Sequence, residues 1–145
     1  MILTFVVVLV LVLFVVRPLQ KNAFFMLYFA LMVGTAFVLE KYGYRFAPFS
    51  KQSFVMFLPP HFVWINFVTL LAYMADKRAA QKGDWRVSEM NLHLLELLGG
   101  SPAAFVSQKI FHHKTKKKSF QMFFLFVLAV QITIVYYACQ ILKII

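Results

Sequence analysis

Three polar residues, Glu89, His93 and Glu96, occur at positions i, i+4 and i+7 of an otherwise apolar stretch, a spacing that places them on one face of a helix. Their carboxylate and imidazole groups form a ligand set suited to iron, manganese or zinc, which His112 or His113 could complete. Metal centres in helical carboxylate proteins draw glutamates and histidines from several helices, whereas one helix supplies both carboxylates here. We therefore predict no metal and no cofactor, with Glu89, His93 and Glu96 as weak candidate ligands.

A hydrogen-bonded polar network is the alternative interpretation of these residues. A buried polar group is costly unless it is hydrogen-bonded, so such groups are expected to bond to one another. Asp76 is expected to pair with Arg86 or with a lysine of a second basic cluster, which would tie two segments together. The predicted network comprises Asp76, Trp85, Arg86, Glu89 and His93.

A dense cationic stretch, H-K-T-K-K-K at 113–118, precedes the last apolar run of the chain. Each lysine near an anionic leaflet contributes about 1 kcal/mol to membrane attraction, and such a patch is also an ordinary topology signal. Lipid head groups are the simplest anionic ligand; nucleic acid is the alternative, although only Trp85 is well placed to stack on a base. The candidate binding residues are Lys77, Arg78, Arg86, His113, Lys114, Thr115, Lys116, Lys117 and Lys118.

Small residues recur every four positions after Glu96, at Gly99, Ala103 and Ser107, with Gly100 beside the first. This pattern lets membrane helices approach closely. The contact could lie within one chain or between protomers of a homo-oligomer, and the pattern leaves both open.

The chain contains no P-loop and none of the G-x-S-x-G, H-E-x-x-H or G-x-G-x-x-G motifs. Three classes of function remain. The first, which we prefer, is a binding or scaffold protein whose basic face engages an anionic ligand. The second is a small membrane enzyme that uses His93, Glu89 and His113, and the third is an oligomeric pore around His93 and Glu96. Whether the chain is an enzyme stays open.

The elements that position these residues are apolar helices. Of 145 residues, 62% are hydrophobic and 18 are Phe, with a mean hydropathy of +0.78, whereas soluble domains are about 45–50% apolar. We predict an all-α membrane bundle, a single domain with four transmembrane helices. The apolar runs cover 2–16, 22–39, 54–75 and 120–145, and Pro59-Pro60 predict either a kink near Leu58 or a spanning helix that begins at His61.

The stretch 88–111 is long enough to cross a bilayer, but a crossing would bury His93, Glu96 and Lys109. A charge at the bilayer centre costs about 2.5 kcal/mol or more. If the stretch is instead a re-entrant or interfacial helical hairpin, broken at Gly99-Gly100, the basic clusters at 77–86 and 109–118 lie on one side, as the positive-inside rule prefers. We predict the hairpin, with the basic segment 76–118 in the cytoplasm.

Four ordered motifs between Tyr73 and Phe120 resemble the DUF1294 family of small bacterial membrane proteins. They are Y-x-x-D-K from Tyr73, W-R-[IV]-[PS]-E at 85–89, L-H-x-L at 92–95 followed by Gly99-Gly100, and F-x-H-K-T-x-K-x-x-F at 111–120. Two positions depart from the family pattern: Ala103 replaces a usual Gly, and Glu96 replaces a small or apolar residue.

The resemblance implies a multi-pass protein of the bacterial inner membrane. It implies no reaction, although some members resemble fusions to a nucleic-acid-binding cold-shock domain. Residues 59–145 form the family-like region in this interpretation, and residues 1–58 are an added N-terminal helical pair and loop.

Overall fold

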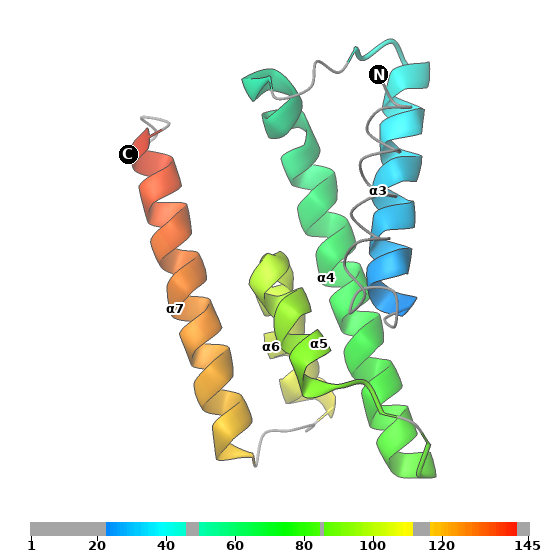
Figure 1. The fold of residues 1–145 in the computed structure, drawn as a ribbon, viewed down its shortest axis with the longest axis vertical. Helices are drawn as coiled ribbons and strands as arrows, with labels where there is room; N and C mark the ends of the chain where they lie inside the picture. The colour runs from blue at the N-terminus through cyan, green and yellow to red at the C-terminus, as the bar shows by residue number, and fades with distance from the viewer. Residues whose placement is uncertain (1–22, 46–49, 85, 112–116, 142–145) are drawn as a thin grey trace. The chain divides into compact units, whose positions relative to one another are not determined.

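The computed structural model describes residues 23–45, 50–84, 86–111 and 117–141, and every element within those ranges is a helix. The chain divides into two compact units, Met1–Val68 and Thr69–Ile145. The elements are α3 (Ala23–Lys41), α4 (Lys51–Lys82), α5 (Glu89–Leu95), the π-helical turn η1 (Glu96–Gly100), α6 (Ser101–Phe111) and α7 (Lys118–Ile141) (Figure 1).

Three of the described helices, α3, α4 and α7, are long and apolar enough to cross a membrane. They coincide with the apolar runs predicted at 22–39, 54–75 and 120–145. The run predicted as a further span, 2–16, lies outside the described residues. Each of the three helices carries large hydrophobic side chains on its exposed surface, such as Phe37, Phe62 and Phe126. Hydrocarbon is the medium in which such surfaces are stable.

The first unit contains α3 and the part of α4 up to Val68. The hydroxyl of Tyr28 lies 2.6 Å from Nδ1 of His61, and Nε1 of Trp64 donates to Oγ1 of Thr35 at 2.8 Å. These pairs satisfy polar groups between two apolar helices. The side chains that α3 buries are Phe25, Tyr28, Met32 and Ala36.

Helix α4 begins at Lys51 because Ser50 caps it: Oγ of Ser50 accepts a hydrogen bond from the backbone N–H of Ser53 at 3.1 Å. The helix then continues through the two prolines at 59–60. The predicted alternative, a spanning helix that begins at His61, is therefore wrong. The cap supplies a start signal upstream of the prolines.

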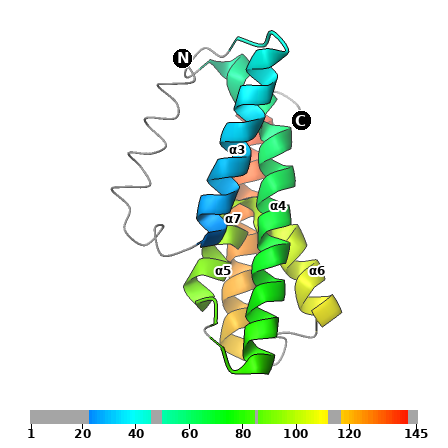
Figure 2. The same ribbon diagram turned by 90° about the vertical axis from the view of Figure 1, so that its right-hand side faces the viewer.

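In the second unit, α5, η1 and α6 form a hairpin, hereafter the 89–111 hairpin. Ser88 caps α5 by accepting from the N–H of Asn91. The chain reverses at Gly99, whose φ of 118° is accessible mainly to glycine. In Figures 1 and 2 both arms run from this turn toward the end of the unit where α7 begins.

The hairpin turn packs closely against α4. A Cβ atom on Gly100 would lie 2.1 Å from Oγ1 of Thr69, so only glycine fits at this contact. The apolar core of the second unit then extends from this turn toward α7. Its buried residues are Ala72, Tyr73, Leu92, Leu95, Ala104, Phe120, Phe124 and Val127.

Candidate functional site: a basic end and a buried polar cluster

The end of α4, the two ends of the 89–111 hairpin and the start of α7 meet at one end of the second unit, hereafter the basic end. Nζ of Lys77 donates to the backbone carbonyl of Phe111 at 2.8 Å. Nζ of Lys117 lies 2.8 Å from both carboxylate oxygens of Glu89. These contacts join residues 34 and 28 positions apart, so Lys77 lies beside the end of α6 and Lys117 lies beside the start of α5.

Lys77 also has a local role at this end. An ammonium group at the C-terminus of a helix satisfies a carbonyl that has no partner within the helix and opposes the negative end of the helix dipole. Its Nζ lies 5.3 Å from the centre of the Phe111 ring as well. Lys77 therefore attaches the end of α6 to α4.

Asp76 is fully buried at the basic end, and Arg86 approaches it with two nitrogens. Nε and one terminal nitrogen of Arg86 lie 3.3 Å from the two carboxylate oxygens. The Arg86 side chain is 49% exposed, so it joins a buried carboxylate to the surface. A paired guanidinium offsets the cost of burying the charge of Asp76.

Glu96, at the start of η1, is the centre of a second set of hydrogen bonds, hereafter the Glu96 cluster. One carboxylate oxygen accepts from the hydroxyl of Tyr73, and the other lies 2.7 Å from Nδ1 of His93. Gln108 donates to the Tyr73 hydroxyl at 3.2 Å, and Gln121 donates to Oε1 of Gln108 at 2.9 Å. The cluster thus joins α4, the hairpin and α7 through one fully buried carboxyl group.

Two aromatic rings hold the His93 imidazole in place. Its ring centre lies 4.3 Å from that of Phe120 and 4.4 Å from that of Phe123. Only 10% of the His93 side chain is exposed, so its edge alone reaches the surface. An ionised Glu96 can only accept hydrogen bonds, so His93 then donates from Nδ1. This arrangement joins Tyr73, Glu96 and His93 in one chain of hydrogen bonds.

The structure separates the residues that the helical spacing had placed together. Glu89 lies beside Lys117, whereas His93 and Glu96 lie in the Glu96 cluster. Within the described ranges, no three His, Cys, Asp or Glu side chains are close enough to hold one metal ion. Of the other candidates, Trp85, His113, Lys114, Thr115 and Lys116 lie outside the described residues.

The small residues divide between the turn and α6. Gly99 forms the reversal itself, and Gly100 is buried against α4. Ala103 and Ser107 lie on α6, with Ser107 fully buried inside the unit. The regular four-residue spacing therefore does not form one continuous helical stripe, because the helix is broken at Gly99.

Sequence reasoning missed Tyr73, Gln108 and Gln121 as members of a functional or structural site. Tyr73 was named only as the first residue of the Y-x-x-D-K motif. The two glutamines were the better signal, since an amide in an apolar helix needs a partner inside the protein.

Two comparisons with known proteins concern this same part of the chain. A family model described as "Protein of unknown function (DUF1294)" matches residues 66–120. The "Uncharacterized protein YsdA" of Bacillus subtilis (strain 168) is 35% identical over 66 residues, which are 46% of this chain and 74% of that protein. The chain belongs to the DUF1294 family. No solved structure matches it.

The DUF1294 match confirms the resemblance found in the four motifs and begins seven residues earlier, at 66 rather than 73. It extends from the second half of α4 through the hairpin to the start of α7. The basic end and every member of the Glu96 cluster except Gln121 therefore lie within the DUF1294 region.

Proposed function

We propose that this DUF1294 protein is a multi-pass protein of the bacterial inner membrane whose basic end binds anionic lipid head groups at the cytoplasmic leaflet. One observation carries the proposal: the contacts of Lys77 with Phe111 and of Lys117 with Glu89 gather both basic segments at a single end of the second unit. A membrane surface is the extended anionic partner that such an end would meet.

The lengths of the hairpin arms support this topology. At 1.5 Å per residue, the 7 residues of α5 and the 11 residues of α6 reach about 10 and 16 Å, against a hydrocarbon core of about 30 Å. The hairpin in this proposal re-enters the bilayer or lies at its interface, and α3, α4, α7 and the apolar run at 2–16 cross it. In this proposal residues 59–145 are the DUF1294-like region, and residues 1–58 are an added N-terminal helical pair and loop.

The charges of the basic end support lipid binding. The segment 76–118 contains nine basic and four acidic residues. Arg86 and Lys117 remain 49% and 54% exposed although each contacts a carboxylate. Arg78, Lys109 and Lys118 are exposed as well. The basic end can therefore offer cations to phosphate groups without giving up its internal contacts.

Lipid binding is tested by native mass spectrometry of the full chain in mild detergent, titrated with phosphatidylglycerol or phosphatidylcholine. The test variant carries Lys114→Gln, Lys116→Gln and Lys118→Gln. The control variant removes three positive charges elsewhere in the chain, by Lys41→Gln, Arg45→Gln and Lys51→Gln. At about 1 kcal/mol per lysine, the test variant should bind phosphatidylglycerol on the order of a hundredfold more weakly. The control should bind nearly as the parent does.

Two results would contradict the proposal. Equal affinity of the parent for phosphatidylglycerol and phosphatidylcholine would remove the role of the head-group charge. Retention of RNA in place of lipid, lost in the lysine variant, would assign the basic end to nucleic acid instead.

A further inference from the structure

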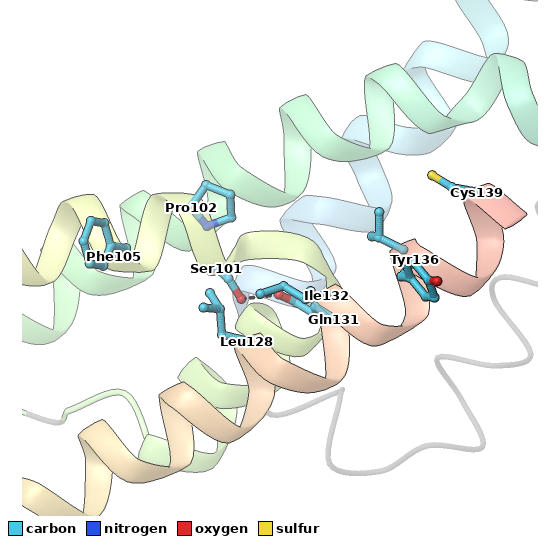
Figure 3. Close-up of a pocket in the computed structure, with 9 residues that line it drawn as sticks. Ser101, Pro102, Phe105, Leu128, Gln131, Ile132, Tyr136 and Cys139 are labelled. Carbon is cyan, nitrogen blue, oxygen red and sulfur yellow. Dashed lines mark hydrogen bonds between the residues drawn. The ribbon is translucent and has the colours of Figure 1, made fainter. Parts of the chain in front are cut away.

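An apolar groove runs between α6 and α7 of the second unit, with a volume of about 610 Å³. Phe105 and Leu128 lie toward one end in Figure 3, and Tyr136 and Cys139 lie toward the other. Ser101, Pro102, Gln131 and Ile132 line the stretch between them. The volume is within the range of small-molecule sites, about 300–1,000 Å³.

The polar groups along this groove are already bonded within the protein. Oγ of Ser101 lies 2.5 Å from Oε1 of Gln131, and Nε2 of Gln131 donates to the carbonyls of Glu96 and Leu97. The Tyr136 hydroxyl accepts from Gln140 at 2.8 Å. The groove therefore presents mainly carbon to an occupant, and it suits a hydrocarbon chain better than a polar molecule.

A cation stands at the end of the groove nearest the basic end. Nζ of Lys109 lies 4.4 Å from the centre of the Phe105 ring, and Phe105 lines the groove. Lys109 is exposed in the last turn of α6. The groove thus combines a positive group at one mouth with an apolar channel behind it, which is complementary to the anionic head and acyl chain of a lipid.

We propose that this groove holds one acyl chain of an anionic glycerophospholipid whose phosphate lies at Lys109. Ser101 bonds to Gln131 at mid-groove; Lys109 lies eight residues from Ser101 along α6 and Cys139 lies eight residues from Gln131 along α7, so an occupant that reaches both is about 24 Å long. The inference rests on the proposed lipid function and adds to it a defined site for one lipid molecule.

Cys139, the single cysteine of the chain, lines the far end of the groove and reports its occupancy. The experiment measures the rate at which N-ethylmaleimide alkylates Cys139 of the full chain in mild detergent, with added dioleoyl phosphatidylglycerol or phosphatidylcholine. Phosphatidylglycerol should slow alkylation by covering the thiol, and phosphatidylcholine should do so only at higher concentration.

Matched variants test the two parts of the site. Ile132→Trp fills the groove and should abolish the effect of phosphatidylglycerol on alkylation, whereas Ile134→Trp, equally exposed on α7 but outside the groove, should preserve it. Lys109→Gln should raise the phosphatidylglycerol concentration needed for half protection about fivefold. Lys51→Gln, at an exposed lysine at the start of α4 and outside the basic end, should leave that concentration nearly unchanged.

The outcomes separate this inference from the proposed function. If native mass spectra show phosphatidylglycerol retained through Lys114, Lys116 and Lys118 but Cys139 reacts at an unchanged rate, the groove assignment is overturned and the proposed function stands. If phosphatidylglycerol is not retained at all, both are overturned. Protection that persists in Ile132→Trp also overturns the groove assignment.

Discussion

Glu96 is an ionisable residue that is fully buried in the second unit and depends on hydrogen bonds from its neighbours. Its carboxyl group is fully buried at the start of the π-helical turn, with Tyr73 and His93 bonded to its two oxygens. A buried group of this kind is tolerated only where its hydrogen bonds are made, because water cannot replace them. The Glu96 cluster therefore specifies how the hairpin sits against α4 and α7.

Tyr73→Phe tests the cluster, since it removes the one hydroxyl that joins Glu96 to Gln108. Leaving these buried groups without that partner should lower the free energy of unfolding by about 2 kcal/mol. Tyr137→Phe, at a 60% exposed position of α7, is the control and should change it by less than about 0.5 kcal/mol. Unfolding in mixed micelles of increasing denaturing detergent measures both, and equal stability of the two variants would rule out a structural role for the cluster.

Part of this residue-scale arrangement could be predicted and part could not. Asp76, Arg86 and His93 stood out because charged and polar groups in an apolar segment need partners. Regular helical spacing put Glu89 on one face with His93 and Glu96, but Glu89 bonds to Lys117 at the start of α7, whereas His93 bonds to Glu96 and lies against Phe120. Pairing of Glu89 with Lys117 depends on the fold of the hairpin, which local spacing does not encode.

At the scale of the elements, the 89–111 hairpin depends on two consecutive glycines that have different structural roles. Gly99 supplies the positive φ of the reversal, and Gly100 allows the turn to touch α4. Both the Gly-Gly break and the Ser88 cap are local signals, so they were predictable from the residues themselves. The continuation of α4 through Pro59 and Pro60 was not, because proline lacks the backbone N–H and disfavours the interior of a helix.

Gly100→Ala should disrupt the contact between the hairpin and α4. The Cβ atom of the new alanine would lie 2.1 Å from Oγ1 of Thr69 and 2.7 Å from the carbonyl oxygen of Leu95. The backbone must therefore shift, and we expect the free energy of unfolding to fall by about 2–3 kcal/mol. Gly34→Ala is the matched control, because no atom lies within 4 Å of its added Cβ and α3 should gain about 0.5–1 kcal/mol. The same detergent titration compares them, and a neutral Gly100→Ala would contradict the close packing of the turn.

At the scale of the whole molecule, hydropathy predicted the three long apolar helices, because a run of about 20 apolar residues is a sufficient signal. Length could not decide whether 88–111 crosses the bilayer, since the stretch is long enough to do so. The contact of Glu89 with Lys117 places the first residue of the hairpin beside the start of α7, and the contact of Lys77 with Phe111 places its last residue beside α4. In the topology that we propose, both basic segments face the same leaflet.

The central claim is that both basic segments face one side of the membrane, and impermeant thiol labelling of sealed vesicles tests it most directly. Single cysteines are introduced by Lys82→Cys, Lys118→Cys and Ser50→Cys into a Cys139→Ser background. We predict that the cysteines at 82 and 118 react only from the cytoplasmic side, and the cysteine at 50 only from the opposite side. Labelling of positions 82 and 118 from opposite sides would show that the 88–111 stretch crosses the bilayer and would contradict the account.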